Sequence, residues 1–523
     1  MFGSGLARYS ELVRGTLPAV LDKTSNPIAT PLNSSNRRLL DLVRPRDWGI
    51  SNHEYYDLVV IGGGTAGLVT AIGAAGLGAR VLLLERRLLG GDCLNVGCVP
   101  SKSLLRSARV IREVREALSL GMSVSNVAFD FSAAMQRMRE IRADIAQNDS
   151  AERLAAAGVH VLFGTARFVD RKHICIQEKQ IRFHRAVIAT GGRPVTPSIP
   201  GINDAGYLTN ESIFSLTELP PRLLVIGAGS IGCELAQVFS LFGSEVTVAD
   251  LADRPLAQED PDAAAIVQRR LSQDGVHFEL GVQIKKIHRS GSEAVAFWSR
   301  GSEHGEIKTN EILVATGRAP NIEDLGLDAA GVDSDSHGVL VNEELQTTNS
   351  RIYAAGDVAL RWKFTHAADA SARLLLQNAF FFGHRRVSRL VIPWCTYTIP
   401  EVAHVGTTYK EALKQRASII TIPFKDIDRA VIDGDTDGFV RVSHQKSRMM
   451  GCTIVGDHAG DLIAHAATVL RMKGTVSDLA GAIMPYPTRS EALRKVGDSY
   501  RRTLLTPRRK RWLSRYFEAR RWF

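Results

Sequence analysis

The chain has 523 residues, of which 45% are hydrophobic and 23% charged, the balance of an ordinary globular protein of two to four domains. Its formal net charge of +10 gathers at one end, because the stretch from Pro507 to Phe523 holds seven basic residues and one acid. This placement argues against a nucleic-acid-binding core, and no apolar run is long enough to span a bilayer.

Residues 1–54 are predicted to form a loose N-terminal extension. The opening stretch, MFGSGLARYSELVRG, mixes Arg8, Glu11 and Arg14 into its apolar residues and so lacks the continuous apolar region of a secretory signal. A basic organelle-targeting segment is the alternative, against which Glu11 and Asp22 argue. The run TSNPIATPLNSSN is rich in turn-forming residues and typical of a loose segment. We therefore expect a cytoplasmic protein.

An apolar strand, Tyr56–Ile61, then runs into a turn with the GxGxxG pattern, formed by Gly62, Gly64 and Gly67. A second strand, Ala79–Leu84, ends in Glu85, 18 residues after the last glycine. Glycines let a pyrophosphate approach the backbone at a helix N-terminus, and the acid accepts hydrogen bonds from a ribose diol. This unit predicts a dinucleotide-binding domain.

Two cysteines follow in the stretch GGDCLNVGCVPSK, which starts at Gly90. In a regular helix, Cα atoms spaced like those of Cys93 and Cys98 lie about 8–9 Å apart, farther than a disulfide tolerates. The segment must therefore bend, and its glycines permit this. Pro100 suits the first turn of a following helix, where the helix dipole and Lys102 favour a thiolate at Cys98. We predict a redox dithiol; two small buried side chains are the alternative, and a zinc site lacks further ligands at suitable spacing.

The dinucleotide pattern recurs later in the chain. Leu223–Ile226 leads into a second GxGxxG turn, formed by Gly227, Gly229 and Gly232. The next strand, Glu245–Val248, is followed by Asp250, again 18 residues after the last glycine. Two copies at the same spacing predict that the chain binds two dinucleotides.

Each fingerprint is followed by a similar strand and small-residue turn. Val187–Pro194 reads VIATGGRP, and Leu313–Pro320 reads LVATGRAP. We expect each to close one nucleotide-binding unit; two unrelated strand–turn elements are the alternative.

From about residue 55 to 500 these motifs closely resemble the FAD-dependent pyridine nucleotide–disulfide oxidoreductases, which include dihydrolipoyl dehydrogenase, glutathione reductase and mercuric reductase. The resemblance implies FAD at the first fingerprint, NAD(P)H at the second, and a homodimer in which both chains build each active site. The stretch Ile352–Asp357 looks like the second FAD motif of the family, with Asp357 as a flavin ligand. The residues implied to bind cofactors are Gly62, Gly64, Gly67, Glu85, Gly91, Thr190, Gly191, Gly227, Gly229, Gly232, Asp250, Gly317 and Asp357.

The resemblance also implies roles for the dithiol and its neighbours. Cys93 would be the interchange thiol that meets substrate, and Cys98 the flavin-side thiolate. Lys102 would lie near the flavin with Glu234 as its ion-pair partner; the alternative is two solvated charges on helix surfaces. Since Asp250 favours a ribose diol, NADH is expected, although Arg254 leaves NADPH open.

One departure from the family bears on the substrate. Disulfide reductases of the family carry a His-Pro near the C-terminus as acid–base for the interchange thiol, and here Tyr486 stands in that place, followed by Glu491 in the same motif. Tyrosine, with an unperturbed pKa near 10, is a poor base at neutral pH. Tyrosine here resembles mercuric reductase, but the chain lacks that family's terminal cysteine pair and its N-terminal metal-binding domain.

Three hypotheses follow. The first is an NAD(P)H-dependent FAD oxidoreductase of mercuric reductase type, which passes electrons through a Cys93–Cys98 disulfide to a metal ion or small electrophile. The second is a dihydrolipoyl dehydrogenase or another disulfide reductase. The third is a non-enzymatic redox-sensing flavoprotein. No resident metal and no nucleic-acid partner are expected.

The expected fold class is α/β, with two Rossmann-like dinucleotide-binding domains and a C-terminal α+β dimerisation domain. After the extension (1–54) we expect a first part of the FAD-binding domain (55–205), an NAD(P)H-binding domain (206–324), a second FAD-binding part (325–390), the dimerisation domain (391–506) and a basic aromatic tail (507–523).

The tail itself carries an aromatic stripe. Trp512, Leu513, Tyr516 and Phe517 fall on one face of a helix, Phe523 rejoins that face, and basic residues flank it. A basic helix with such a face can lie on an anionic membrane, which would place the protein peripherally at a membrane. The alternative is that the stripe packs on the protein's own dimer interface.

Overall fold

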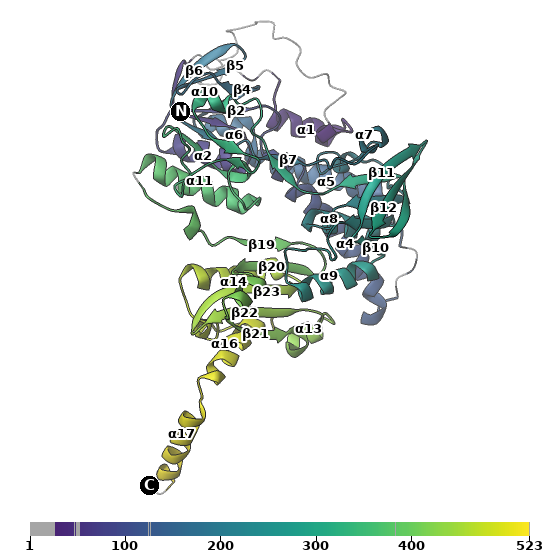
Figure 1. The fold of residues 1–523 in the computed structure, drawn as a ribbon, viewed down its shortest axis with the longest axis vertical. Helices are drawn as coiled ribbons and strands as arrows, with labels where there is room; N and C mark the ends of the chain where they lie inside the picture. Colours follow the sequence, from purple (N-terminus) through teal and green to yellow (C-terminus); the bar gives the residue numbers. More distant parts are fainter. Residues whose placement is uncertain are drawn as a thin grey trace, which may run out of the picture.

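A computed structural model describes residues 27–46, 48, 53–123, 125, 127–381 and 383–521. Two α/β bodies lie side by side, a third body lies below them, and the last helix extends away from it (Figure 1). The opening stretch, on which the cytoplasmic and organelle-targeting interpretations rest, lies outside the described residues.

The first body is built on a seven-stranded sheet whose strands come from distant parts of the chain. Its centre is parallel, and two antiparallel strands extend one side. The strands are, in spatial order, β3 (Val159–Phe163), β2 (Val81–Glu85), β1 (Tyr55–Ile61), β6 (Lys179–Ile188), β5 (His173–Ile176) and β4 (Ala166–Phe168), with β18 (Ile352–Ala354) also beside β6.

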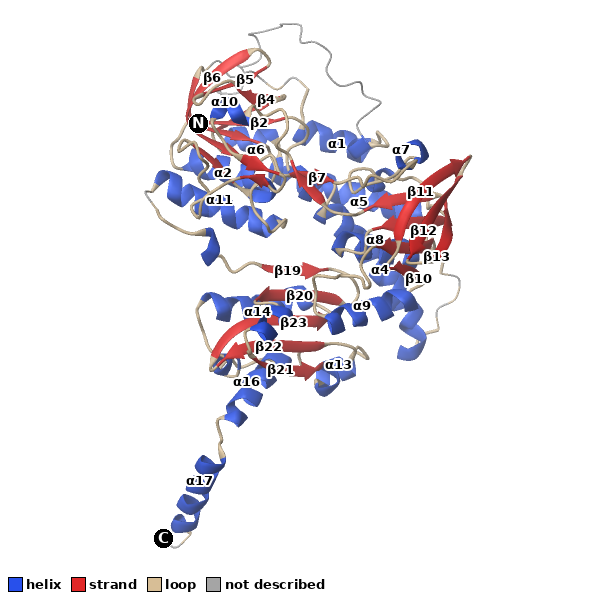
Figure 2. Ribbon diagram, viewed as in Figure 1, coloured by secondary structure: helices blue, strands red, loops and turns tan. Residues whose placement is uncertain are grey.

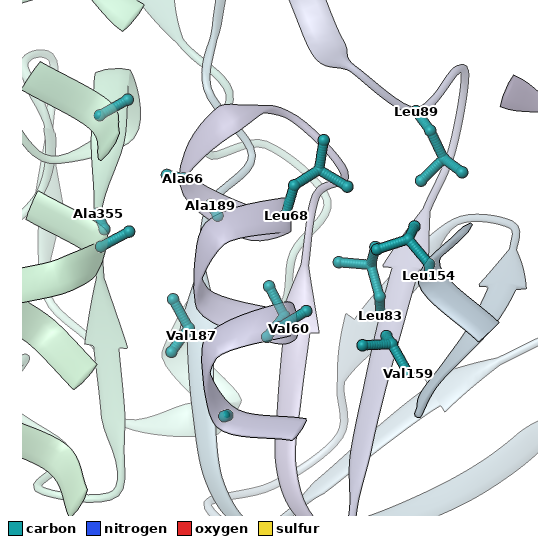
Figure 3. Packing of buried hydrophobic residues seen from close by; sticks show 14 of the residues in the cluster. Val60, Ala66, Leu68, Leu83, Leu89, Leu154, Val159, Val187, Ala189 and Ala355 are labelled. Carbon is teal, nitrogen blue, oxygen red and sulfur yellow. The ribbon is translucent and has the colours of Figure 1, made fainter. Parts of the chain in front are cut away.

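Apolar side chains on the face of this sheet pack against the helix that follows the first glycine turn. Helix α2 (Thr65–Gly76) contributes Ala66 and Leu68 to the same buried cluster as Val60 of β1 and Val187 of β6 (Figure 3). Helix α11 (Thr365–Phe380) packs beside α2. The strands are apolar because helices or further chain cover both faces of a parallel sheet.

The second body repeats this plan on a smaller scale. Its parallel sheet follows the order β10 (Val276–Leu280), β9 (Glu245–Asp250), β8 (Arg222–Ile226) and β14 (Glu311–Val314). Helix α8 (Ser230–Phe242) begins at the second glycine turn, and α9 (Pro261–Gln273) follows β9. An antiparallel sheet completes it, formed by β11 (Gln283–Ser290), β12 (Glu293–Arg300) and β13 (Glu303–Thr309).

The third body is α+β (Figure 2). Helices α14 (Ala459–Arg471) and α16 (Glu491–Thr503) pack on its antiparallel sheet. The strand order is β19 (Pro393–Thr396), β20 (Glu401–Gly406), β23 (Arg448–Gly456), β22 (Phe439–Gln445) and β21 (Ser418–Pro423). The predicted fold class is therefore confirmed.

Shorter elements complete the three bodies. They are α6 (Ala151–Ala156), α7 (Ile202–Ala205), α10 (Leu327–Ala330), α12 (Tyr409–Lys414), α13 (Asp428–Ile432), α15 (Val476–Leu479), and the paired strands β7 (Gly192–Pro194) with β15 (Arg318–Pro320) and β16 (Ser334–Asp335) with β17 (Gly338–Val339).

The described part of the N-terminal extension is folded, so its interpretation as a loose segment is wrong there. A 3₁₀ turn (Pro27–Ala29) precedes helix α1 (Ser34–Val43). The polar residues that suggested a loop instead cap the helix: Oδ1 of Asn33 accepts a hydrogen bond of 2.9 Å from the backbone N–H of Asn36. Leu39 and Val43 are fully buried against the first body.

Candidate active site

The two glycine-rich turns have the same geometry at the starts of α2 and α8. Gly62 and Gly227 have φ values of +108° and +113°, which favour glycine. A Cβ on Gly67 or Gly232 would lie 1.8 or 1.9 Å from the carbonyl oxygen of the first glycine of its own turn. Only glycine therefore lets each helix begin directly at its turn, where the first N–H groups remain for a ligand.

The acid that follows each turn binds the turn itself. Glu85 accepts hydrogen bonds from the backbone N–H of Gly63 (2.6 Å) and of Arg87 (2.5 Å). Asp250 accepts equivalent bonds from Ala228 (2.5 Å) and from the residue two positions after itself (2.7 Å). Burial raises the pKa of Glu85, although these hydrogen bonds oppose the rise. The contact of each acid with a ribose diol stays a prediction.

A cavity of about 1220 Å³ runs along the carboxyl ends of both sheets. Pockets for small ligands usually measure about 300–1,000 Å³, so this one has room for a dinucleotide. The expected site residues that line it are Gly62, Gly64, Glu85, Gly91, Cys93, Cys98, Lys102, Thr190, Gly191, Gly229, Glu234, Gly317 and Asp357. Gly67, Gly227, Gly232 and Asp250 shape the turns and are not among its lining residues.

The cavity wall fits FAD at the first turn. A Cβ on Gly91, whose φ is +58°, would lie 2.7 Å from the Cα of Gly64. Side chains are therefore excluded where the first turn meets the dithiol segment, and backbone N–H groups line a cradle for a pyrophosphate.

The dithiol segment bends as the sequence predicts. Helix α3 (Gly91–Asn95) ends before Gly97, and α4 (Cys98–Glu116) begins at the second cysteine. A Cβ on Gly97 would lie 2.8 Å from the carbonyl oxygen of Asp92, so the break requires this glycine. Cys98 is the first residue of α4, and its Sγ lies 3.5 Å from Oγ1 of Thr365, the first residue of α11.

No disulfide joins Cys93 and Cys98 in this structure, and the two sulfurs are electrostatically unequal. The hydrogen bond from Cys93 is the largest cause that lowers the pKa of Cys98 to about 6; burial opposes this, and Thr365 and the charge of Lys102 add to it. The same hydrogen bond, together with burial, raises the pKa of Cys93. At neutral pH Cys98 is therefore a thiolate and Cys93 its hydrogen-bond donor.

Lys102 and Glu234 form an ion pair beside the dithiol. Nζ of Lys102 lies 2.6 Å from Oε2 of Glu234. The other oxygen of this buried carboxylate accepts 2.9 Å from the backbone N–H of Tyr397, and the Lys102 ammonium lies 4.6 Å from the centre of the Tyr397 ring. The alternative of two solvated helix-surface charges is therefore wrong for this pair. Its part in catalysis stays a prediction.

A charged cluster that the sequence analysis missed lies in the same cavity wall. The guanidinium of Arg318 bonds to Asp92, next to Cys93, and its Nε lies 3.5 Å from Oδ2 of Asp357. Burial raises the pKa of Asp357, and the charge of Arg318 opposes the rise. Arg318 directly follows Gly317 in the stretch Leu313–Pro320. This position beside an expected cofactor-binding glycine is the sequence feature that could have indicated Arg318. The cluster sets a cation between two carboxylates in the cavity wall.

Tyr486 and Glu491 lie in the third body and are not among the residues that line the cavity of their own chain. Tyr486 is 70% exposed, and its Oη donates to Oδ2 of Asp428 over 3.0 Å. This contact raises the pKa of Tyr486. Glu491 is buried and bound by Arg494 at 3.1 Å. A partner subunit would have to supply Tyr486 to Cys93.

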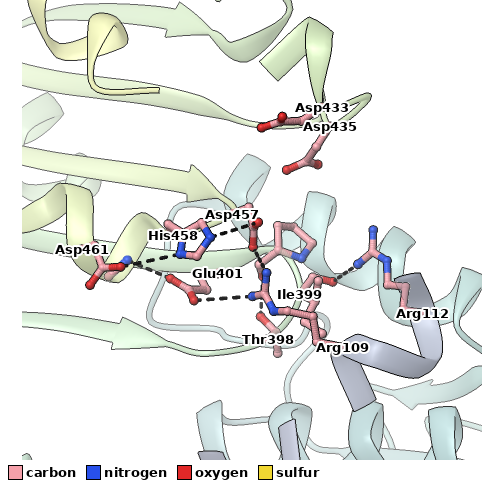
Figure 4. A network of polar contacts seen from close by, with 12 residues as sticks. Arg109, Arg112, Thr398, Ile399, Glu401, Asp433, Asp435, Asp457, His458 and Asp461 are labelled. Atoms are coloured by element: carbon pink, nitrogen blue, oxygen red, sulfur yellow. Dashed lines mark hydrogen bonds and ion pairs between the residues drawn. The ribbon is translucent and has the colours of Figure 1, made fainter. Parts of the chain in front are cut away.

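Polar contacts join the third body to the dithiol helix (Figure 4). The guanidinium of Arg109 in α4 bonds to Asp457. Nη1 of Arg112 in the same helix donates over 3.0 Å to the carbonyl oxygen of Ile399. Because α4 begins at Cys98, these contacts fix the third body relative to the dithiol.

The basic tail forms helix α17 (Pro507–Arg520), none of whose residues is buried. Trp512 and Tyr516 stack with ring centres 6.0 Å apart, and Phe517 is exposed. Phe523 lies outside the described residues. Within the described part of the chain, no helix is both long and apolar enough to cross a membrane, and no cluster of three or more His, Cys, Asp or Glu side chains is placed to hold a metal ion.

Two family profiles match the chain. One, described as pyridine nucleotide-disulphide oxidoreductase, matches residues 56–372, and the other, its dimerisation domain, matches residues 392–496. The mercuric reductase of Staphylococcus aureus is 34% identical over 444 residues, 84% of this chain and 81% of that protein. The dihydrolipoyl dehydrogenase of Bacillus subtilis (strain 168) is 31% identical over 447 residues, 83% of this chain and 96% of that protein.

A solved structure is also similar over most of the chain. The HOCl-induced flavoprotein disulfide reductase RclA of Escherichia coli, in a Cu(II) complex, superposes with a TM-score of 0.77 at 28% identity. The match covers 85% of this chain and 99% of RclA.

Proposed function

The chain belongs to the pyridine nucleotide–disulphide oxidoreductase family, and from this premise we propose that its cysteine pair, Cys93 and Cys98, reduces a soft metal ion or small electrophile and not an organic disulfide. The enzyme is a FAD-dependent oxidoreductase that uses a pyridine nucleotide, and its dimerisation domain supports a homodimer.

The observation that carries the proposal is the tyrosine at position 486. Its hydrogen bond to Asp428 raises its pKa, so Tyr486 stays protonated at neutral pH and cannot take a proton from a thiol. Among the described residues that line the cavity, His366 is the one histidine, and its Nε2 lies 2.6 Å from the carbonyl oxygen of Pro393. An organic disulfide, which needs an acid–base group at the interchange thiol, is therefore a poor substrate.

The residues around the dithiol divide the reaction between the two sulfurs. The chemistry that FAD supplies when bound is the transfer of two electrons from the nicotinamide to the disulfide. Two electrons and one proton convert the Cys93–Cys98 disulfide into one thiolate and one thiol; Cys98 keeps the charge and Cys93 the proton. A soft metal ion that binds Cys93 displaces its proton to solvent, so this step needs no base at the interchange thiol. The charge of Lys102, which is paired with Glu234, favours the thiolate of Cys98.

Thiolates are soft ligands that favour soft metal ions. The RclA structure is described as a Cu(II) complex, and the relatives include mercuric reductases. We therefore propose to compare NADH consumption with Hg(II) plus a thiol, Cu(II), lipoamide and a quinone. Faster turnover of a metal ion than of lipoamide supports the proposal, whereas efficient lipoamide turnover makes the protein a dihydrolipoyl dehydrogenase-like enzyme. If none of these four acceptors supports NADH consumption, the result favours a redox sensor.

NADH is the proposed electron donor. The carboxylate of Asp250 lies at the second glycine turn, where it favours a ribose diol and repels a 2′-phosphate. Arg254, which left NADPH open, donates from Nη2 to the carbonyl oxygen of Ala257 over 2.9 Å and so is engaged elsewhere.

We also propose that α17 contacts an anionic membrane surface. No residue of this helix is buried, and its exposed aromatic side chains stand among basic ones. Packing of the same stripe on a partner subunit is the competing outcome, which the vesicle experiment in the Discussion distinguishes.

A further inference from the structure

A buried polar bridge links α1 to α3, the short helix that contains Cys93. The side chain of Asn36 in α1 is fully buried, and its Oδ1 accepts a hydrogen bond of 2.7 Å from Nη2 of Arg142 in α5 (Phe131–Ile145). Nη1 of the same guanidinium donates over 2.8 Å to the carbonyl oxygen of Asn95, two residues after Cys93. The side chain of Arg142 therefore connects the N-terminal extension to the backbone of the dithiol segment.

Arg142 depends on this bridge. It has no exposed surface, and no ion pair between described residues includes it. Burial lowers its pKa to about 10, with the charge of Arg139 as a further cause. A buried cation is costly unless hydrogen bonds satisfy it. The amide oxygen of Asn36 supplies one of the acceptors for Arg142, which an apolar side chain could not do.

A second set of contacts holds the other end of the same loop. The backbone N–H of Leu89 donates to the carbonyl oxygen of Val43 over 3.1 Å. Nη1 of Arg44 donates to the carbonyl oxygen of Arg86 over 2.9 Å. Ile28 is buried in the same apolar cluster as Leu89 and lines the cofactor cavity.

We propose that residues 27–45 form a clasp that holds the dithiol loop, residues 86–97, against the first body, and that Asn36 is a positioning residue that acts through Arg142. The clasp lies outside both segments matched by the family profiles. Most of the dithiol loop lines the cavity, so the clasp also retains the cofactor. Only its consequence for turnover rests on the proposed function of Cys93 and Cys98.

The test measures cofactor release and local opening in the purified holoenzyme. Asn36→Ala is expected to release FAD about tenfold faster after dilution, equivalent to about 1.4 kcal/mol, as followed by FAD fluorescence. Amide hydrogen exchange should accelerate in residues 86–97 and α1 but not in the strands of the third body. Asn36→Asp keeps an acceptor for Arg142 and should restore slow release, which a general loss of packing would not allow.

Asn349→Ala is the matched control. Asn349 is equally buried in the same body, but its Nδ2 donates to the carbonyl oxygen of Ala330, away from the dithiol loop. This variant should keep the wild-type rate of FAD release. If Asn36→Ala does not fold, Arg44→Ala, at a partly exposed position, tests the same loop. Wild-type release and exchange in the folded variant, or equal release from Asn349→Ala, would overturn the proposal. Neither readout needs an acceptor, so the result is independent of the proposed substrate.

Discussion

Sγ of Cys98 lies 3.5 Å from Oγ1 of Thr365, and each is the first residue of its helix. Two helix N-termini, those of α4 and α11, therefore converge on one sulfur, where their dipoles favour negative charge. The hydrogen bond from Cys93 is the largest cause of the lowered pKa of Cys98, and Thr365 adds to it.

The first prediction concerns this hydroxyl. Thr365→Val removes a donor to the thiolate, so the pKa of Cys98 should rise from about 6 by about one unit. The rate of iodoacetamide alkylation of Cys98 in the reduced enzyme, measured against pH, reports the change. Thr365→Ser keeps the hydroxyl and should titrate like the wild type. An unshifted profile for the valine variant would show that Thr365 does not stabilise the thiolate.

The second prediction concerns the nicotinamide. Asp250 accepts hydrogen bonds from the backbone N–H groups of Ala228, in the second glycine turn, and of Ala252, two residues after Asp250. Asp250→Asn keeps one acceptor oxygen, whereas Asp250→Ala removes both, so the asparagine variant disturbs the turn less. It should reduce the preference for NADH over NADPH, measured as the ratio of kcat/KM values, on the order of tenfold. Asp253→Asn, an exposed neighbour, should leave the ratio unchanged. A wild-type enzyme that prefers NADPH would refute the assignment.

The third prediction concerns Tyr486, which stands where disulfide reductases of the family carry a histidine base. Wild-type turnover of lipoamide should be slow, and Tyr486→His should raise it on the order of tenfold. A well-placed acid–base contributes about 10²–10⁴-fold, but Glu491, which would orient the imidazole, is bound by Arg494. Tyr486→Phe should give no gain. Fast turnover of lipoamide by the wild type would show that the enzyme reduces an organic disulfide with tyrosine at position 486.

The fourth prediction concerns α17. Deletion of residues 507–523 should weaken sedimentation with anionic vesicles and leave NADH-dependent flavin reduction intact, because nothing in this helix lines the cavity. Trp512→Ser with Phe517→Ser should weaken binding without removing a basic residue. The intact protein should lose binding as salt rises. If the intact protein does not bind vesicles and the deletion weakens dimerisation, the aromatic stripe of α17 belongs to the dimer interface.

Local sequence was sufficient to predict structure wherever steric exclusion acts within one short segment. The third glycine of each fingerprint is required because a Cβ at Gly67 or Gly232 would strike its own turn. The bend between Cys93 and Cys98 follows in the same way from the length that a disulfide can span. These patterns predicted the fold class and the walls of the cavity.

Contacts between distant segments could not be predicted in this way. Asp92 and Arg318 are 226 residues apart, and Cys98 and Thr365 are 267 apart. No local pattern in the sequence predicts that Arg318 contacts Asp92 or that Thr365 contacts Cys98. The helix cap at Asn33 was mistaken for a loop for a related reason, since a capping residue is also a turn former.

The central claim is that the Cys93–Cys98 disulfide accepts electrons after FAD, and anaerobic dithionite titration of the oxidised enzyme tests it most directly. Wild-type protein should take up about two two-electron equivalents per subunit, one for the flavin and one for the disulfide. Cys93→Ser and Cys98→Ser should each take up about one, while Cys175→Ser, a cysteine of strand β5, should match the wild type. If either dithiol variant still takes up about two equivalents, the electrons do not pass through this pair and the account is wrong.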